Sequence, residues 1–393
     1  MEPRIVSETT VSPRSTSFEC SNCSKDDAEQ RCSRCTAVKY CSKECQKDHW
    51  VKHKAYCNEI KKLLKKVALE REPLRRYEDW FGNEPYDLFP DDVGHFWSLV
   101  EPRNYCRARH ALSMRLHECG IKNNSKLALE LCVEHLLDLV WLSRGDNLGV
   151  RSLIPGILCV LGEVQEAYDF LKWWKVCDPD GRYDWGNLDL PYCNLKDEDI
   201  FEDLSLLCLH KYTDAFSLVS LFLIKYKVMN QLEKEKFSYE TFLLGTHSRL
   251  GEESPVRKIS GVSVVLQNIK HLIAPGSYKK INILKQHLEE LAKRIDEGNK
   301  FAIPGLLNSA DLLAHPQPQY TSPGTQNEAH SITICEIDHW LATPGIHSYL
   351  KDLYIGLHGK KKAEKNIAEI PNEKAMLTID GSDVYHMDQA KIM

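Results

Sequence analysis

The chain has 393 residues, of which 42% are hydrophobic and 27% charged, and its formal net charge at pH 7 is −5. These proportions are ordinary for a soluble globular protein of two or three domains. The longest apolar run, 216–224, is about half as long as a membrane-spanning helix, and no apolar signal segment stands at the N-terminus. We therefore expect an intracellular, soluble protein of the cytoplasm or nucleus, with reduced thiols and no membrane partner.

Residues 1–17 are rich in Ser, Thr, Pro and Arg, and we expect them to be disordered. A dense group of soft metal ligands follows: Cys20, Cys23, Cys32, Cys35, Cys41, Cys45, His53 and Cys57. The Cys-x2-Cys spacing suits two tight turns, and a helix predicted over Ser42–Ile60 places His53 and Cys57 on one face. Eight ligands suffice for two four-coordinate zinc ions with no open position, so both sites should be structural.

This order of ligands resembles the MYND zinc finger. The local sequence Tyr40-Cys41-Ser42-Lys43-Glu44-Cys45-Gln46, followed by Trp50 and His53-Lys54, matches that family as well. The resemblance implies that the first and third pairs share one zinc ion and that the second and fourth pairs share the other. It assigns Cys20, Cys23, Cys41 and Cys45 to zinc 1, and Cys32, Cys35, His53 and Cys57 to zinc 2. His49, one helical turn before His53, stays open as a competing ligand.

MYND fingers are protein-interaction modules that often bind proline-containing peptides. The resemblance implies that Gln46 and Trp50 line a peptide groove; for Trp50, a structural role in covering the helix is the alternative. Between Cys20 and Lys66 there are twelve Lys or Arg against six Asp or Glu, a net charge of +6. We interpret these lysines as a solvated helix face, because the segment lacks aromatic residues interleaved in a basic patch and a reading helix. We expect no nucleic-acid partner.

The rest of the chain is predicted to be all-α. Helices are expected at Tyr105–Cys119, from the Ser125 cap to Leu142, and at Leu148–Leu161, Glu163–Val176, Asp199–Leu209, Thr213–Glu235, Ser238–Leu250, Val262–Ile273, Tyr278–Glu297, Thr333–Leu341 and Ile346–Leu357. Loops are expected at 178–198 and Pro316–Asn327.

Residues 161–170, from Leu161-Gly162 through Ala167 to Phe170, resemble the second half of a tetratricopeptide unit, and a weaker copy contains Cys119-Gly120 and Ala128. An irregular helical bundle is the alternative. We divide the chain into a disordered segment (1–17), the finger (18–60), a connector (61–102), a tetratricopeptide-like helical domain (103–250), a C-terminal helical region (251–358) and a disordered tail (359–393).

MYND fingers also occur in one class of SET-domain lysine methyltransferases. This chain lacks the Asn-His-Ser-Cys cofactor motif and the β-rich pattern of those enzymes, and it has no phosphate-binding loop, GxSxG or HExxH motif. We therefore expect no enzyme. The sequence predicts a zinc-binding adaptor, with a finger that binds short peptides and a helical-repeat body that binds a second protein partner. The alternative is a transcriptional or chromatin-associated regulator that acts through the finger.

Overall fold

A computed structural model describes residues 18–26, 28–78, 84–207, 214–247, 278–318 and 320–368. Three predictions lie outside these residues: the disordered segment 1–17, the helix 262–273, and the part of the tail from residue 369 onward.

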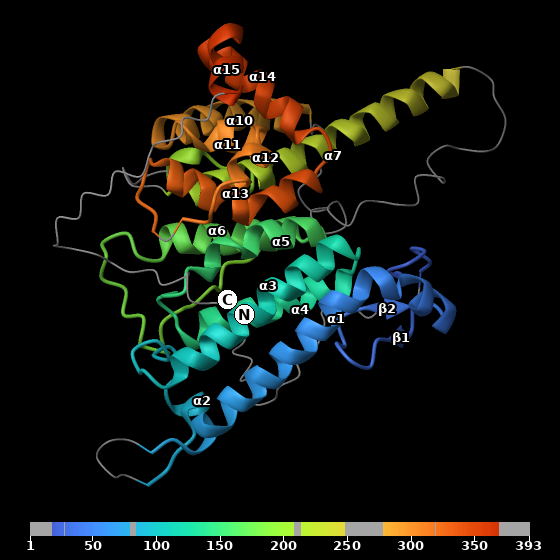
Figure 1. Ribbon diagram of the computed structural model, residues 1–393. Coiled ribbons are helices and arrows are strands. Elements are labelled where there is room, and N and C mark those ends of the chain that lie inside the picture. Colours follow the sequence, from blue (N-terminus) through green and yellow to red (C-terminus); the bar gives the residue numbers. More distant parts are fainter. Residues whose placement is uncertain are drawn as a thin grey trace. The chain divides into compact units, whose positions relative to one another are not determined.

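A two-stranded sheet precedes a body made of helices in the described part of the chain (Figure 1). The helical body was predicted, whereas the sheet was not. The strands are β1 (Gln30–Arg31) and β2 (Lys39–Tyr40), which pair antiparallel with Gln30 opposite Tyr40. The α-helices are α1 (Lys43–Arg71), α2 (Leu88–Asp91), α3 (Pro102–Lys122), α4 (Lys126–Leu142), α5 (Ile154–Leu161), α6 (Val164–Val176), α7 (Ala215–His247), α10 (Tyr278–Gly298), α11 (Ala302–Leu307), α12 (Ser309–Leu313), α13 (Gln326–Leu341), α14 (Ile346–His358) and α15 (Lys360–Ala368). The 3₁₀ helices are η1 (Glu72–Arg76), η2 (Val150–Ser152) and η3 (Leu204–Leu206). None of the described helices combines the length and the hydropathy that crossing a membrane requires.

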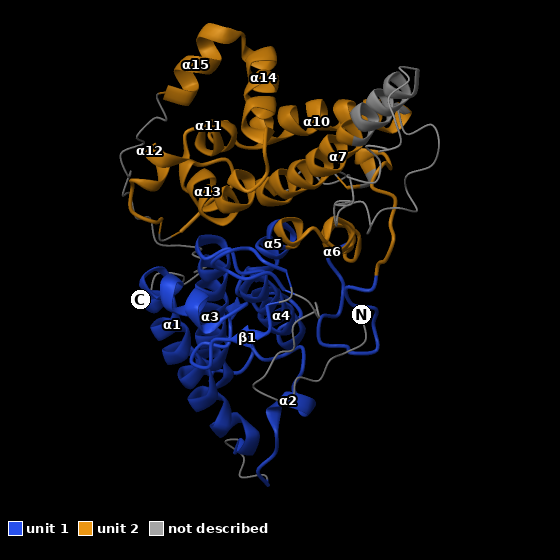
Figure 2. Cartoon of the chain, turned by 90° about the vertical axis from the view of Figure 1, so that its right-hand side faces the viewer, with its two compact units in different colours: residues 1–157, 180–194, 392–393 blue, residues 158–179, 195–391 orange. Residues whose placement is uncertain are grey.

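The chain forms two compact units, coloured separately in Figure 2. Of the residues that the structure describes, unit 1 contains those within 18–157 and 180–194, and unit 2 contains those within 158–179 and 195–368. This division differs from the one expected from the sequence, because the finger and the helix pair α3–α4 belong to the same unit. The tetratricopeptide-like repeat remains a prediction.

Unit 1 is built on three long helices, with α1 packed against α3 and α3 against α4. The Ser125 hydroxyl caps α4, as predicted, by accepting a hydrogen bond from the Ala128 N–H. Helix α3, however, continues through Gly120 to Lys122 instead of ending there. A Cβ at Gly120 would lie 2.5 Å from Cγ of Leu129, so the glycine serves the close approach of the two helices and does not end the first one.

A buried polar network joins α3 to α4. The Arg109 guanidinium pairs with Asp138 and also donates to the Tyr105 hydroxyl (2.8 Å) and to Nδ1 of His135 (3.1 Å). Since Nδ1 of His135 accepts this bond, the imidazole is held in its neutral form. Burial, together with the charge of Arg109, lowers the pKa of His135 well below its usual value.

This network predicts a loss of stability in acid. A histidine with a lowered folded-state pKa contributes stability that is fully present above about pH 6.5 and is lost as the pH falls below it. The loss should be about 1.4 kcal/mol per pH unit. His135→Gln, whose side-chain oxygen can accept from Arg109, should remove this dependence. We would measure the free energy of urea unfolding of both zinc-loaded proteins at pH 7.5 and 5.5. The amount by which the wild type exceeds the variant in free energy of unfolding should be smaller at pH 5.5. An equal difference at both pH values would contradict the prediction.

Unit 2 is centred on α7, which packs against α6, α10 and α13. The sequence predicted separate helices over Thr213–Glu235 and Ser238–Leu250, but α7 is continuous to His247. In its core, the rings of Phe222 and Trp340 stack with their centroids 5.5 Å apart.

The predicted helix over Asp199–Leu209 is wrong within the described residues, where only the short turn η3 forms. Tertiary hydrogen bonds hold this backbone instead. The Asp169 carboxylate accepts from the N–H groups of Asp197 and Glu198, and the buried Lys225 ammonium donates to the Ile200 carbonyl at 2.5 Å. These groups lie far along the chain, so the local sequence pattern does not reveal them.

The expected tail begins with a helix, α15, rather than with irregular chain. The Asn308 side chain donates to the Ile367 carbonyl and the Asn366 side chain donates to the Tyr354 hydroxyl, which fixes α15 on the rest of unit 2.

Candidate functional site

Two turns of the same kind present the first four cysteines. In each turn, the N–H of the residue four positions after the first cysteine bonds to that cysteine's carbonyl: Ser24 to Cys20 at 2.7 Å and Thr36 to Cys32 at 2.9 Å. Both of these residues have a φ of 56°, the left-handed conformation that turns the chain back sharply. The sulfurs of each Cys-x2-Cys pair are thereby brought to one side of the turn.

Helix α1 supplies three further ligands, Cys45, His53 and Cys57. Ser42 caps it by accepting from the N–H of Cys45, which fixes Cys45 in the first turn, directly after Cys41 and the end of β2. His53 and Cys57 lie on the buried face of α1, one turn apart. The hairpin and the helix therefore enclose two groups of four ligands.

The first group is Cys20, Cys23, Cys41 and Cys45. The sulfur of Cys41 lies 3.6 Å from that of Cys23 and 3.5 Å from that of Cys45, and the Cys45 and Cys23 sulfurs are 3.8 Å apart. Zinc–sulfur bonds of about 2.3 Å in a tetrahedron give edges of about 3.8 Å. The donor set and its spacing thus fit one zinc ion.

The second group is Cys32, Cys35, His53 and Cys57, all of which are buried. The Cys32 and Cys57 sulfurs are 3.7 Å apart, and Nε2 of His53 is 3.4 Å from the Cys35 sulfur. A tetrahedral zinc ion with one nitrogen ligand requires nearly the same separations. The two groups have the interleaved composition that the resemblance implied, and they are structural zinc sites, each closed by four protein ligands.

Local hydrogen bonds favour the thiolate form at two of the ligands, Cys20 and Cys32. Burial opposes ionisation of Cys20, but the N–H groups of Cys41, Asn22 and Cys23 outweigh it and lower the pKa of this thiol to about 6. For Cys32, a hydrogen bond from the Cys35 thiol is the main cause of a pKa lowered to about 3. Hydrogen bonding to neighbouring thiols and burial raise the pKa of the Cys35, Cys41 and Cys57 thiols, so these ligands ionise only when metal binding displaces their protons.

His49 is in neither group of ligands. Its Nδ1 lies 3.1 Å from the hydroxyl of the buried Tyr40, and its ring stacks on that of His53 at 6.0 Å between centroids. Burial lowers the pKa of His49, so the ring is neutral. The structure therefore places His53, and not His49, among the zinc ligands. The His49 ring packs against the ring of His53.

The comparison with protein families now bears on these residues. The sequence model of the MYND finger matches residues 20–57. Residues 20–57 form a MYND finger. This kind of finger is generally a module for protein–protein interaction. The comparison with solved structures gave no match.

The MYND finger is joined to the helices of unit 1 by contacts that the sequence did not predict. The Ser125 hydroxyl, besides capping α4, donates to the Ala37 carbonyl at 2.8 Å. Arg115 of α3 pairs with Glu59 of α1 at 2.7 Å. Helix α3 packs along α1, the helix that carries Cys57. Burial, with the nearby Cys57 and Cys32 sulfurs, raises the pKa of the Cys119 thiol on α3 to about 12. The side of the finger that carries zinc 2 is therefore covered by its own chain.

Gln46 and Trp50, the residues expected to line a peptide groove, lie one turn apart on α1, and both are half-buried. The Trp50 ring meets the ring of the zinc ligand His53 edge-on at 6.3 Å, and the Arg34 guanidinium lies 6.0 Å from the Trp50 ring centroid. Trp50 thus packs on the metal site and still presents part of its ring to solvent. Arg34 was not singled out from the sequence, because its position over Trp50 depends on the fold of the Cys32–Cys35 turn.

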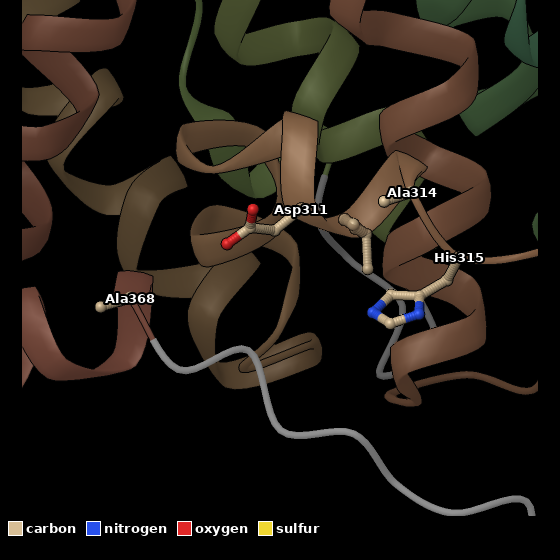
Figure 3. Close-up of a pocket in the computed structure, with 5 residues that line it drawn as sticks. Asp311, Ala314, His315 and Ala368 are labelled. Atoms are coloured by element: carbon tan, nitrogen blue, oxygen red, sulfur yellow. The ribbon is translucent and has the colours of Figure 1, made fainter.

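A pocket of about 300 Å³ lies elsewhere, in unit 2, between α12 and the end of α15 (Figure 3). Its lining is Asp311, Leu312, Ala314, His315 and Ala368. It contains no zinc ligand of the finger, and one carboxylate and one imidazole on an open rim do not form a nucleophile–base arrangement. We assign it no role.

Proposed function

We propose that the protein is an adaptor that acts by binding: its MYND finger takes a short peptide at Gln46 and Trp50, and its helical body contacts a second protein. The observation that carries this proposal is the half-buried Trp50 side chain, whose ring packs on the zinc ligand His53. A large aromatic side chain that is rigidly held and partly open to solvent is a typical anchor for a partner. Both zinc sites have four protein ligands, which leaves no position for substrate or water and supports binding over catalysis.

The proposal of a second binding surface on the helical body rests on its helices alone. A second binding surface there would follow from the tetratricopeptide-like pattern at 161–170, since stacked helix pairs present an extended face. We place the protein in the cytoplasm or the nucleus, in keeping with the reduced zinc thiolates of the finger.

Trp50→Ala is expected to weaken peptide binding strongly while both zinc ions are retained. The zinc-loaded full-length protein would be used to select from a displayed library of random 16-residue peptides, and the affinity of an enriched peptide would be measured by fluorescence anisotropy. Loss of an aromatic anchor should weaken binding at least about tenfold. The matched control is Val51→Ala, because Val51 is the next residue on α1 and is 88% exposed. Unchanged affinity in Trp50→Ala would contradict the proposal, and loss of zinc in that variant would make Trp50 a structural residue.

A further inference from the structure

One side of α1 carries a row of lysines beside Trp50. At 3.6 residues per turn, Lys43, Lys47, Lys54, Lys61 and Lys65 fall within about 40° of arc around the helix; we call these five residues the lysine sector. Four of them are exposed and Lys61 is half-buried. Trp50 lies at the border of this sector with the buried face of the helix, so a ligand on Trp50 has the sector directly beside it.

Arg34 adds a sixth cation at the middle of the sector. It lies over the Trp50 ring and donates to the side-chain oxygen of Asn58 at 2.8 Å. Trp50 and Asn58 are two turns apart, on either side of Lys54, so the Arg34 guanidinium crosses the helix surface at the level of Lys54. Its position is fixed by two contacts, which reduces the entropy lost when it meets an anion.

The acidic residues of α1 lie on other sides of the helix. Glu44, Asp48 and Glu59 fall about 60° or more outside the sector, and Glu59 is already paired with Arg115. Among the residues that the structure describes, no carboxylate lies within ion-pair distance of the five lysines. The Glu44 carboxylate interacts electrostatically with Lys43 and Lys47, so the sector is partly compensated at its N-terminal end. The Lys54, Lys61 and Lys65 part is a strip of positive charge on a chain whose net charge is −5.

We propose that the lysine sector and Arg34 bind acidic side chains of the peptide whose apolar part contacts Trp50. This inference rests on the proposed function of the finger and specifies the class of its ligand: a peptide with an apolar core flanked by Asp or Glu. Charge complementarity along a strip is the reason. From Trp50 to Lys65 the helix rises about 22 Å, a distance that about seven residues of extended peptide span.

A peptide fits this strip better than a nucleic acid does. Single-stranded nucleic acids are bound by several aromatic platforms within a broad positive groove, whereas the sector has one aromatic residue, Trp50, at its edge.

The test compares two triple variants of the zinc-loaded full-length protein. Lys54, Lys61 and Lys65→Gln removes three charges from the sector. Lys52, Lys62 and Lys66→Gln removes three charges from another side of the same helix and is the matched control. The probes are the peptides selected by the wild type from the random 16-residue library and a fluorescein-labelled 20-nucleotide single-stranded DNA, both measured at 50 and 300 mM NaCl.

The selected peptides should contain Asp or Glu within about seven residues of the apolar core. The sector variant should bind them about tenfold more weakly at 50 mM NaCl, the control should bind like the wild type, and the difference should shrink at 300 mM because exposed charges are screened. Peptides that depend on Trp50 but lack acidic residues, and that bind the sector variant normally, would overturn this inference and leave the proposed function standing. DNA binding that is lost in the sector variant and competes with the peptide would also overturn it. Failure to select any peptide that depends on Trp50 would remove the proposed function itself.

Discussion

Cys35→Ser is expected to release one zinc ion and to unfold the whole of unit 1, not the finger alone. Cys35 is fully buried at the second zinc site, and the residues that follow it, Ala37 and Val38, are completely inaccessible to solvent. The Ala37 carbonyl holds the Ser125 hydroxyl at the start of α4, and α3 lies against the Cys57 side of the site. A structural zinc ion contributes on the order of 10 kcal/mol to the folding of a small domain, which is comparable to the entire stability of a domain this size. The stability lost with this zinc ion should therefore exceed the stability that the α3–α4 contacts provide.

The measurement is zinc content by elemental analysis, together with hydrogen exchange of the α3 and α4 amides in the full-length chain. Cys23→Ser is the matched control, because Cys23 is an exposed ligand of the other zinc site. That variant should also lose one zinc ion, yet α3 and α4 should keep most of their protection. Three of the four ligands of the first site are half-buried or exposed, so losing its zinc ion should unfold the outer side of the finger and leave the buried second site intact. Wild-type protection of these helices in Cys35→Ser would show that the finger contributes nothing to unit 1.

The zinc sites could be predicted from the sequence because ligand chemistry is local. Paired cysteines at turn spacing, and a histidine and cysteine one helical turn apart, identify the eight ligands. Which pairs share a zinc ion was implied by the resemblance to the MYND finger. The choice of His53 over His49 was less secure, since both lie on one face of α1. The Tyr40 hydroxyl on β2 occupies Nδ1 of His49 and so keeps His49 away from the metal ligands.

The unit boundaries could not be predicted in the same way. No Pro, Gly or change of pattern separates the zinc-binding turns of α1 from its continuation, so one helix of 29 residues belongs both to the finger and to the helical body. The contact between Ser125 and Ala37 joins residues 88 positions apart, and each looks ordinary in its own segment. The local hydrophobic pattern indicates which face of a helix is apolar, but it does not indicate which segment of the chain covers that face.

The loop at 178–198 illustrates the same limit. The lack of helical periodicity correctly predicts a loop here, but the loop's conformation is held by Arg144, which is completely inaccessible to solvent. The guanidinium donates to the carbonyls of Asn187 (2.5 Å) and Leu190 (3.1 Å) and to the Tyr183 hydroxyl (3.0 Å). Its carbon lies 4.4 Å from the centroid of the Tyr192 ring, so an aromatic face and backbone oxygens surround the charge.

Arg144→Met is expected to lower the free energy of unfolding by roughly 3 kcal/mol and to release residues 180–194 from unit 1. Methionine fills much of the volume, so the main loss is of the three part-buried hydrogen bonds from the guanidinium, each of which contributes about 1 kcal/mol. Arg144→Lys is the informative companion, because an ammonium keeps the charge but lacks the planar fork that reaches three acceptors, so its loss should be intermediate. Urea unfolding gives the energies, and hydrogen exchange over 180–194 locates the change. Wild-type stability and exchange in Arg144→Met would show that the loop is held by Tyr192, whose hydroxyl bonds to the carbonyls of Val140 and Arg144, and that the buried charge is dispensable.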